Sequence, residues 1–553
     1  MSDGTAGAES AGANSTSEAR PISAAAVKSM LADGGELAIL DVREELIYSR
    51  SHLLHARSAP LSRLELRVPR LVPRRSTRIV LVDDGDGLGQ RAAKILANHG
   101  YAKLFILDNG VTGWTDAGYV LFSGVNVPSK AFGEVVEHEN GTPSIDALAL
   151  KRMIESGDDL IIVDSRPFDE FARVSIPTAT NVPGAELVLR VPDLAPHPTT
   201  TVVVNCAGRT RSIIGAQSLI NAGLPNPVVA LRNGTMGWTL AGLHPDHGKD
   251  RRAPVAPPSR RALAWATAAA DQIAQRCGVR KIDMDRLHQW QREGEQRTLY
   301  LFDVRDPREY AAGHVAGAVS APGGQLVQAT DQFVGTLNAR IVLVDDLEVR
   351  AVMTASWLLQ MGWTEAFVLV AAGAETGSPA SAVLGPTERP ELHLDPAELA
   401  RLMNQNAATV LDLSLSRNYR AAHIPGAWFA IRSRLDRALP IIEPQGTLVL
   451  TSEDGIVAAL ALDEAAALLK HPVRYLAGGN AAWTASGRPL TQADPRFADE
   501  PLDVWLKPYE RESGTAEAMQ DYLSWEVDLP ARIRRDGTTK FRPLVYGPSP
   551  GAS

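Results

Sequence analysis

The chain has 553 residues, of which 22% are charged, and it has a formal net charge of −8. This balance provides no basic surface for nucleic acid, and no apolar run reaches the roughly 18 residues of a membrane span. Two cysteines, Cys206 and Cys277, are too few for a disulfide framework and have no metal-ligand cluster beside them. We therefore expect several domains, no metal or other cofactor, a reducing cytoplasmic location, and small anions and proteins as partners.

The first recurring pattern along the chain is a short apolar strand that ends in aspartate. Before it, residues 1–20 are small and polar without a secretory signal, and we expect a disordered tail there. The pattern occurs four times, as AILDVREE, LIIVDSRPFDEF, LYLFDVRDPREY and TVLDLSLSRNY, with aspartates at Asp41, Asp164, Asp303 and Asp412. Repetition of this kind indicates four copies of one structural unit.

A second apolar strand follows in each copy at a nearly constant distance. These strands end at Asp83, Cys206, Asp345 and Ser452. The spacing from the first aspartate is 42 residues in three copies and 40 in the fourth. A helix-like segment and another short apolar strand follow each time. Alternating strands and helices predict an α/β fold with four domains, each a parallel sheet flanked by helices.

In the second copy, a cysteine stands where the strand turns into the helix. The loop there reads Cys206, Ala207, Gly208, Arg209, Thr210, Arg211, and Gly223 is placed to end the helix that follows. Such a loop turns backbone N–H groups and the positive end of the helix dipole inward, which makes it an anion cradle. A cysteine that only packs in the core is the alternative. The strand, the glycine and the two arginines favour a reactive thiolate instead.

This loop resembles the active-site loop of the rhodanese family of sulfurtransferases, in which a cysteine opens a six-residue turn after a central parallel strand. The segments LIIVDSRPFDEF and VVALRNGTMGW are similar to the family's D-x-R signature and its G-x-x-x-W closing segment. The resemblance implies four tandem rhodanese-like domains and a cysteine that carries sulfur as a persulfide. Because basic loops in the family resemble those of thiosulfate users, it also favours thiosulfate as the donor.

The other three copies lack a thiol at this position. After the ends of their second strands they read DGDGLG, DLEVRA and EDGIVA. An aspartate there brings negative charge into the cradle and cannot accept sulfane sulfur. We therefore expect domains 1, 3 and 4 to be inactive and to have a structural, docking or regulatory role.

Several other recurring residues are interpreted as structural. Histidine recurs in three copies, but Ser175 replaces it in the copy that contains Cys206, so we do not expect these histidines to be catalytic. Asp164 and Arg166 are expected to fix loops near the sheet. Cys277 ends a helical pattern and is expected to pack there, and a role as a resolving thiol stays open. The histidines are His52, His314 and His423, and the recurring tryptophans, expected in the cores, are Trp114, Trp238 and Trp483.

The domain boundaries are predicted from changes in composition along the chain. The stretch His244 to Arg261 is charged and rich in proline, as expected of an exposed linker between two tandem pairs of domains. The last segment is too aromatic for disorder, so we expect it to pack on the fourth domain or across domain junctions. The predicted division is a tail (1–20), domain 1 (21–126), domain 2 with Cys206 (127–245), a linker (246–260), domain 3 (261–380), domain 4 (381–492) and a C-terminal extension (493–553).

Sulfur transfer is the leading functional hypothesis. The Cys206 thiolate would take the outer sulfur of a small anionic donor such as thiosulfate, and a thiol, cyanide or a protein would then remove that sulfur. Ala207, Gly208 and Thr210 would complete the substrate-binding loop, while Arg209 and Arg211 would hold the sulfonate end of the donor.

Two other functional classes stay open. A dual-specificity phosphatase has five residues between its cysteine and its arginine, whereas only four separate Cys206 from Arg211, and Ser212 stands at the arginine's place. The second alternative is a sulfur carrier without turnover, a redox sensor or a scaffold, in which the inactive modules bind partners. The physiological donor and acceptor are not identified by the sequence.

Overall fold

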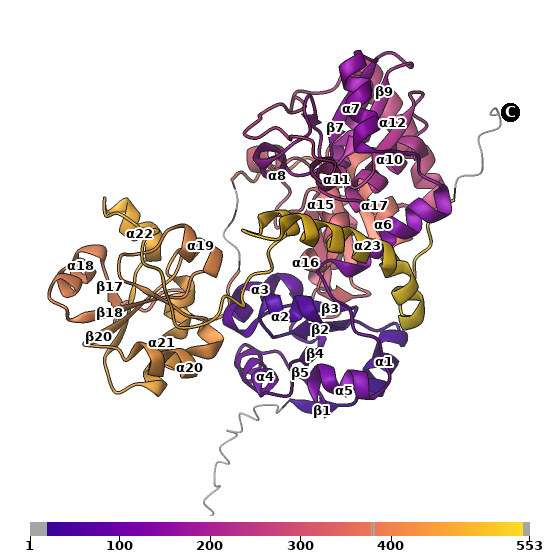
Figure 1. The fold of residues 1–553 in the computed structure, drawn as a ribbon. Helices are drawn as coiled ribbons and strands as arrows, with labels where there is room; N and C mark the ends of the chain where they lie inside the picture. The colour runs from indigo at the N-terminus through magenta and orange to yellow at the C-terminus, as the bar shows by residue number, and fades with distance from the viewer. Residues whose placement is uncertain (1–18, 378, 380–381, 546–553) are drawn as a thin grey trace, which may run out of the picture.

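The structure is a computed structural model that describes residues 19–377, 379 and 382–545. The predicted α/β fold is confirmed: four domains each surround their own largely parallel sheet (Figure 1). Most of the predicted N-terminal tail lies outside the described residues. Its last two residues are described, and strand β1 begins at Arg20 and pairs with β5.

Domain 2 contains the cysteine loop and has a five-stranded, fully parallel sheet in the order β6-β10-β9-β7-β8. Val202, Val203 and Val204 of its central strand are fully buried, as their apolar run predicts. Asp164 and Asn205 are register partners, so the carboxyl ends of two central strands meet beside Cys206. Its elements are β6 (Ser144–Ile145), α7 (Ala147–Ser156), β7 (Leu160–Asp164), α8 (Phe168–Arg173), β8 (Thr180–Asn181), α9 (Leu187–Leu194), β9 (Thr201–Asn205), α10 (Thr210–Asn221), β10 (Val228–Leu231) and α11 (Gly234–Leu240).

Domains 1 and 3 repeat this plan. Domain 1 comprises β1 (Arg20–Ile22), α1 (Ala24–Ala32), β2 (Leu37–Asp41), α2 (Glu45–Arg50), β3 (Ala56–Ser58), α3 (Leu64–Leu71), β4 (Arg78–Val82), α4 (Leu88–Asn98), β5 (Lys103–Leu107) and α5 (Gly110–Asp116), and helix α6 (Val127–Asn140) leads from it to domain 2. Domain 3 comprises α12 (Arg260–Cys277), β11 (Arg280–Ile282), α13 (Met284–Arg292), β12 (Leu299–Asp303), α14 (Pro307–Ala312), β13 (Val319–Ser320), α15 (Gly323–Gln328), α16 (Thr330–Phe333), β14 (Thr336–Leu337), β15 (Arg340–Asp345), α17 (Val349–Gln360) and β16 (Ala366–Val370).

Domain 4 is the outermost unit in Figure 1, where it lies to the left of domain 1. Its sheet has the order β17-β21-β20-β18-β19-β22. Its elements are β17 (His393–Leu394), α18 (Pro396–Asn404), β18 (Ala408–Asp412), α19 (Ser416–Ala421), β19 (Trp428–Phe429), α20 (Leu435–Ile442), β20 (Thr447–Thr451), α21 (Ile456–Leu468), β21 (Val473–Leu476), α22 (Gly479–Ala485) and β22 (Arg496–Phe497).

The recurring histidines and tryptophans have structural contacts. Each histidine stacks on a tyrosine, with ring centroids 4.0 to 4.2 Å apart, and its Nδ1 lies within hydrogen-bond distance of a main-chain carbonyl. Each tryptophan is buried, and its indole N–H donates to a main-chain carbonyl six residues further along the chain. In domain 2, Ser175 and Phe171 stand at the places of the histidine and the tyrosine.

The domains do not pair in tandem, contrary to the expectation drawn from the linker. Domain 2 packs on domain 3, where Arg350 donates to Glu186 at 2.9 Å. Domain 1 packs on domain 4, where Arg432 donates to Glu65 at 2.9 Å. Strand β14 of domain 3 also pairs antiparallel with β2 of domain 1. Domains 2 and 3 follow each other in the chain, whereas the contacts of domain 1 with domains 3 and 4 join domains that are not consecutive.

The predicted linker is half-exposed but is attached to domain 2. The backbone of Asp246 forms an antiparallel bridge with Ser175, and Arg252 forms a parallel bridge with Asn181. Arg190 donates to the carbonyl of Ala256 at 2.6 Å. The charged and proline-rich composition, from which an exposed linker was predicted, does not indicate these main-chain contacts.

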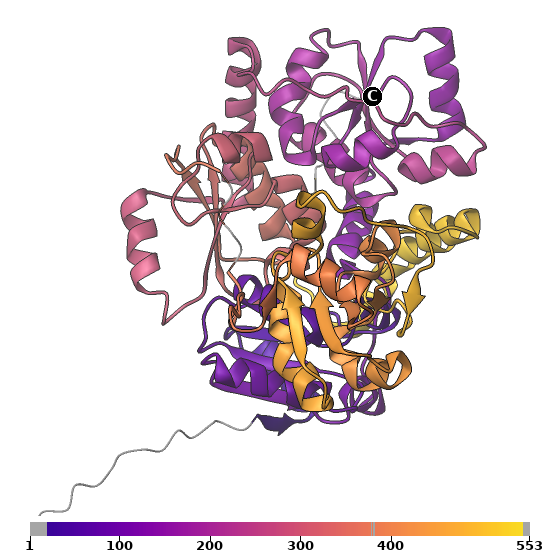
Figure 2. The same ribbon diagram turned by 90° about the vertical axis from the view of Figure 1, so that its left-hand side faces the viewer.

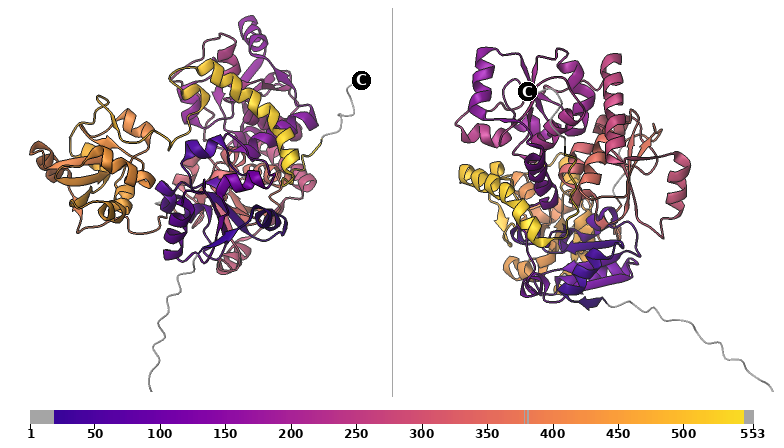
Figure 3. Two further views of the ribbon diagram at one scale, coloured as in Figure 1. Left: turned by 60° about the horizontal axis from the view of Figure 1, so that its bottom comes forward. Right: turned by 90° about the vertical axis from the view of Figure 1, so that its right-hand side faces the viewer.

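The C-terminal extension joins distant domains. Strand β22 adds to the edge of the domain 4 sheet through β19. The chain then leaves domain 4 and forms helix α23 (Thr515–Asp536), which packs against α6 between domains 1 and 2. The views in Figures 2 and 3 show the same long yellow helix between these two domains. In the described part of the chain, no helix is both long enough and apolar enough to cross a membrane.

Glu44 makes the contact between domains 1 and 4 sensitive to pH. The hydroxyls of Ser62 and Ser433 donate to its buried carboxylate at 2.9 and 2.7 Å. Burial raises the pKa of Glu44 to about 7, from an ordinary value of 4.5. The folded protein therefore holds this proton more tightly than the unfolded chain does, so the stability it contributes is lost as the pH rises from about 4.5 to about 7.

We expect the melting temperature to fall between pH 5 and pH 7.5, and Glu44→Gln to remove part of this fall because glutamine has no proton to release. Melting curves at both values check it, with exposed Glu139→Gln as the control. An unchanged pH dependence in the Glu44 variant would show that other groups cause the effect.

Candidate active site

Cys206 lies at the carboxyl end of the central strand β9, and helix α10 begins four residues later. Only 2% of its surface is exposed. Its Sγ lies 3.4 Å from Oγ of Ser212, whose hydroxyl also reaches the carbonyl of Arg209 at 2.8 Å. The strand and the helix therefore fix the thiol at the edge of the sheet where parallel α/β folds bind ligands.

The loop after Cys206 presents backbone N–H groups with no protein partner. Within the described residues, the amides from Ala207 to Ser212 donate no hydrogen bond to a protein acceptor. The amides of Thr235 and Met236 instead bind the carbonyls of Cys206 and Ala207 at 2.8 and 2.9 Å, which holds the loop from the other side. The result is a rigid turn whose own donors stay available for a ligand.

Domains 1 and 3 show what this turn binds. In domain 1 the carboxylate of Asp83, at the place of Cys206, accepts from the amides of Gly85 and Gly89 at 2.9 and 2.8 Å. In domain 3 the carboxylate of Asp345 accepts from the amides of Leu347 and Arg350 at 3.2 and 2.8 Å. An internal carboxylate thus occupies the cradle in both of these domains, which lack the cysteine. In domain 2 the amides at the matching positions include those of Gly208 and Ser212, which bind no protein acceptor among the described residues.

Domain 4 follows the same plan with a hydroxyl. Oγ of Ser452 accepts from the amide of Ala458 at 3.4 Å, six residues further on. In each of the three domains without the cysteine, the side chain at its position therefore accepts a hydrogen bond from an amide of the loop or of the helix that follows.

A buried ion pair holds the end of strand β9, from which the cysteine loop starts. Nε and Nη2 of Arg166 donate to the two oxygens of Asp164 at 2.9 and 2.7 Å, and both side chains are fully buried. Asp164 also accepts from Nδ2 of Asn205 at 2.7 Å. These residues fix the end of β9, as the sequence predicts, and contact neither the cysteine nor its cavity. Gly234 covers the loop closely, since a Cβ there would lie 2.3 Å from the carbonyl oxygen of Cys206.

Both arginines of the loop are bound by carboxylates of the protein. Arg209 forms an ion pair with Glu134 at 2.7 Å and a second one with Glu137. Arg211 donates to Glu170 at 2.8 Å and to Oε1 of Gln325, in domain 3, at 3.0 Å. Their charges are therefore partly neutralised and their positions are fixed, which the sequence did not indicate.

A cavity of about 200 Å³ lies over the loop and is built by four parts of the chain. They are the start of α6 with the two residues before it, the cysteine loop of domain 2 with one residue each from α8 and α11, helices α15 and α16 of domain 3, and the C-terminal extension. Thr210 is not among its lining residues, because its hydroxyl points to Glu526 of α23 at 3.3 Å. The lining residues are Val125, Asn126, Lys130, Glu170, Cys206, Ala207, Gly208, Arg209, Arg211, Met236, Gln325, Gln328, Ala329, Gln332, Trp505, Lys507, Pro508, Tyr509 and Tyr522.

Cations line this cavity, and most of their carboxylate partners lie behind them. The cations are Lys130, Arg209, Arg211 and Lys507, whereas Glu170 is the one lining carboxylate. Lys130 lies 2.9 Å from the fully buried Glu526. Burial alone would lower the pKa of Lys130, but Glu526 raises it above its ordinary value, so the lysine is charged. Burial likewise opposes ionisation of Glu170, but Arg211 and Lys507 together lower its pKa. The cavity therefore suits a small anion.

Sequence reasoning missed the residues of this site that lie outside the cysteine loop. Lys130 is on α6, Gln328 is on α15 of domain 3, and Tyr522 is on α23 of the extension. The aromatic composition of the extension was one signal, because it indicated that this segment packs against the domains. Gly133 gives a further local signal, because a Cβ there would lie 2.8 Å from Cγ2 of Thr210, so α6 can approach α10 only with glycine at this position.

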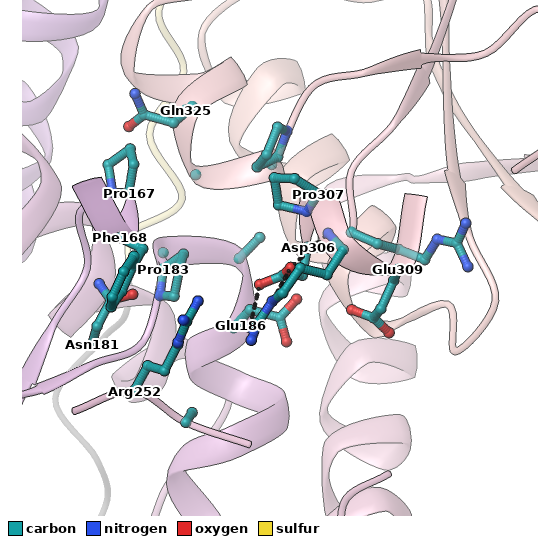
Figure 4. Close-up of a pocket in the computed structure, with 18 of the residues that line it drawn as sticks. Pro167, Phe168, Asn181, Pro183, Glu186, Arg252, Asp306, Pro307, Glu309 and Gln325 are labelled. Atoms are coloured by element: carbon teal, nitrogen blue, oxygen red, sulfur yellow. Dashed lines mark hydrogen bonds and ion pairs between the residues drawn. The ribbon is translucent and has the colours of Figure 1, made fainter. Parts of the chain in front are cut away.

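A second cavity of about 290 Å³ lies between domains 2 and 3 (Figure 4). It includes Phe168 and Arg252, whose guanidinium stacks over the phenyl ring at 3.9 Å. Gln325 lines both cavities. No cysteine lines this second cavity.

Cys277 has no such surroundings. It ends α12, which Gly278 caps, and it packs partly buried against the shared core of domains 2 and 3. Burial raises the pKa of Cys277 to about 11, so it is a neutral thiol at neutral pH. In the part of the chain that the structure describes, no group of three or more His, Cys, Asp or Glu side chains could hold a metal.

The comparisons with known proteins agree with this geometry. A model of the rhodanese-like domain matches residues 23–117, 146–241, 283–375 and 395–486. The structure of a thiosulfate sulfurtransferase from Pseudomonas aeruginosa is 46% identical, with a TM-score of 0.92, and the alignment covers 95% of this chain and 100% of that one. No match was found among the curated proteins.

Two further solved structures match a segment of about one domain. A protein of unknown function from Rhodopseudomonas palustris, described as a possible tyrosine phosphatase, is 25% identical with a TM-score of 0.17, over 18% of this chain and 84% of its own. A rhodanese-related protein from Thermoplasma volcanium is 21% identical with a TM-score of 0.17, over 18% of this chain and 98% of its own. The four domain matches and the long relative show that this chain belongs to the rhodanese-like family.

Proposed function

We propose that this protein moves sulfane sulfur from a donor such as thiosulfate to a thiophilic acceptor through a persulfide on Cys206. That it is an enzyme of the sulfurtransferase class follows from its family and from the relative that shares 46% of its sequence. One observation carries the mechanism. The same turn holds a carboxylate in domains 1 and 3, whereas in domain 2 it surrounds a thiol with unpartnered amides.

The first half-reaction loads the cysteine. The Cys206 thiolate attacks the outer sulfur of thiosulfate, a new S–S bond forms, and the S–S bond of the donor breaks with its electron pair leaving on sulfite. The charge balances, because a dianion and a thiolate give a persulfide anion and sulfite. The terminal persulfide sulfur takes the place that the aspartate oxygens take in domain 1. The amides of Gly208 and Ser212 are placed to stabilise its charge.

The cations of the cavity support the choice of a small anionic donor. Lys130, Arg209, Arg211 and Lys507 line it, and charge-assisted contacts from such groups contribute about 1.5–3 kcal/mol each. Because both arginines are held by carboxylates, we assign the closest stabilisation of the reacting sulfur to the amides and the attraction of the donor to all four cations. A reducing compartment such as the cytoplasm suits a free thiol with this chemistry.

Mass spectrometry of the intact chain tests this function. After incubation with thiosulfate and removal of the excess, we expect a gain of one sulfur atom, placed by digestion on the peptide that contains Cys206. Cyanide should remove it. Without a second thiol at an equivalent loop, one sulfur per chain is the most that the four cradles can accept.

This experiment, a steady-state assay with cyanide and a phosphatase assay together separate the alternatives. A carrier would load once and would turn over only with its protein acceptor, so repeated turnover with cyanide argues against it. A gain on Cys277 would move the site, and an alkylatable Cys206 that gains nothing would exclude thiosulfate as the donor. Phosphatase activity would appear as hydrolysis of a phosphate ester by the unloaded enzyme.

A further inference from the structure

We propose that the cavity between domains 2 and 3 is a binding site for a small organic carboxylate with an apolar ring, and that Arg252 of the linker holds the carboxylate. No cysteine lines this cavity, so the proposal does not depend on the sulfur chemistry at Cys206. It also gives the segment that connects the two domains a role in binding.

Equivalent turns of two repeats form one wall of this cavity. In domain 2, Pro183 and Gly184 follow strand β8, and in domain 3, Pro322 and Gly323 follow strand β13. The two turns touch, because a Cβ on Gly324 would lie 2.9 Å from the amide nitrogen of Gly184. Such a close approach of two main chains needs glycine. This wall therefore consists of backbone and proline rings.

Apolar side chains form much of the remaining wall. Pro167 and Phe168 come from the start of α8 in domain 2, and Pro307 comes from the start of α14 in domain 3. Pro254 and Val255 of the linker also line the cavity. Figure 4 shows Phe168 on one side and Pro307 on the other. The volume of about 290 Å³ suits a small organic molecule, and the apolar wall favours one with a ring.

Four arginines line the cavity, and one of them has no carboxylate partner. The other three form ion pairs at 2.6 to 3.0 Å, Arg190 with Glu186, Arg305 with Asp303 and Arg308 with Asp306. Arg252 forms no ion pair within the described part of the chain, and its guanidinium stacks over Phe168 at 3.9 Å. A stacked guanidinium keeps its N–H edge available, and this planar edge fits both oxygens of a carboxylate.

The carboxylates of the cavity are stabilised by groups other than Arg252. Three of the four lining carboxylates accept from other arginines, namely Glu186, Asp306 and Glu309. The fourth, Asp169, lies in the first turn of α8, where the positive end of the helix dipole stabilises it. Arg252 is therefore the cation of this cavity that a ligand can use.

The main chain fixes Arg252 at the edge of domain 2. The amide of Asn181 donates to the carbonyl of Arg251, and the amide of Ala253 donates to the carbonyl of Asn181, both at 2.9 Å. These hydrogen bonds hold the residues on either side of Arg252 against the end of β8. Because the linker and the stacked side chain are already ordered, a ligand loses little binding energy in ordering them.

Isothermal titration calorimetry on the full-length protein, without a sulfur donor, tests the proposal with three probes. 1-Naphthaleneacetate has the carboxylate and the ring, 1-naphthaleneacetamide has the same shape without the charge, and acetate has the carboxylate without the ring. We expect 1-naphthaleneacetate to bind with a Kd of about 1 mM or lower, as is typical of ligands of this size. The amide and acetate should each bind at least about 5-fold more weakly, because each lacks one of the two contacts.

The variant Arg252→Met keeps an apolar side chain over Phe168 and removes the guanidinium. We expect its affinity for 1-naphthaleneacetate to fall to within about 2-fold of that for the amide, while the affinity for the amide is retained. Arg260→Met, at an exposed position outside the cavity, is the matched control and should keep the preference for the carboxylate. Lys507→Met should keep it too, since Lys507 lines the cavity over Cys206 instead.

Several results would overturn the proposal. On the unaltered protein, these are no binding of 1-naphthaleneacetate, equal affinity for the amide, or equal affinity for acetate, and they hold even if a variant fails to fold. A preference that is lost in Lys507→Met but kept in Arg252→Met would place the ligand over Cys206 and would refute it as well. Because no sulfur donor is present, failure of this inference is distinct from failure of the proposed function.

Discussion

Cys206→Ser is expected to lower the rate of thiosulfate-to-cyanide sulfur transfer by about 10³-fold or more, since removal of a covalent nucleophile costs at least this much. A serine hydroxyl fits the space of the thiol, and Ser452 shows that the same turn accepts a hydroxyl in domain 4. The variant should therefore fold. Steady-state assays of thiocyanate formation measure the loss, and the melting temperature verifies folding.

Cys277→Ser is the matched control for this prediction. Cys277 lies at the end of α12 away from the cavity residues, and its raised pKa keeps it protonated. Its rate should stay within about 2-fold of the unaltered enzyme. A loss comparable to that of Cys206→Ser would instead indicate a mechanism with two thiols, and substantial turnover without Cys206 would refute the assignment of the site.

Arg350→Met is expected to lower the free energy of unfolding by about 3–5 kcal/mol, because it leaves buried carboxylates without their cation. Arg350 is fully buried and forms ion pairs with Asp345, Asp346, Glu186 and Glu309 at 2.7 to 2.9 Å. Glu186 belongs to domain 2, so the change weakens the contact that holds the two domains together. Urea denaturation checks the stability.

Arg308→Met serves as the comparison for Arg350. Arg308 is also ion-paired, with Asp306 at 2.9 Å, but its side chain is 46% exposed. Exposed pairs contribute at most about 1 kcal/mol, so this variant should be nearly as stable as the unaltered protein. If the two arginine variants lose the same stability, burial does not decide the strength of the Arg350 cluster.

The repeated strands predict the fold well because their signal is local. The apolar runs that end at Asp164 and Cys206 recur with a fixed spacing, and a strand between helices can bury such a run only in a parallel sheet. The cysteine loop is predicted for the same reason, since a turn between β9 and α10 brings its amides together whatever surrounds it. The structure adds the aspartates of domains 1 and 3 as occupants of the same turn.

The partners of the two loop arginines could not be predicted. Glu134 and Glu170 are far from Arg209 and Arg211 in sequence, and many other carboxylates could have served. The same holds for the linker, whose composition predicts exposure but not its bridges to domain 2. Long-range pairs of charged residues have no periodic pattern, so the sequence does not indicate which of them meet.

By itself, the sequence determined the four α/β units, the one loop with a thiol and the type of chemistry that this loop supports, because strands, turns and their backbone donors depend on neighbouring residues. Only the tertiary structure decided that domain 2 packs on domain 3 and that Lys130 and Tyr522 line the cavity over the Cys206 loop. Such arrangements depend on the complementary shape and charge of surfaces hundreds of residues apart, which no local pattern in the chain records.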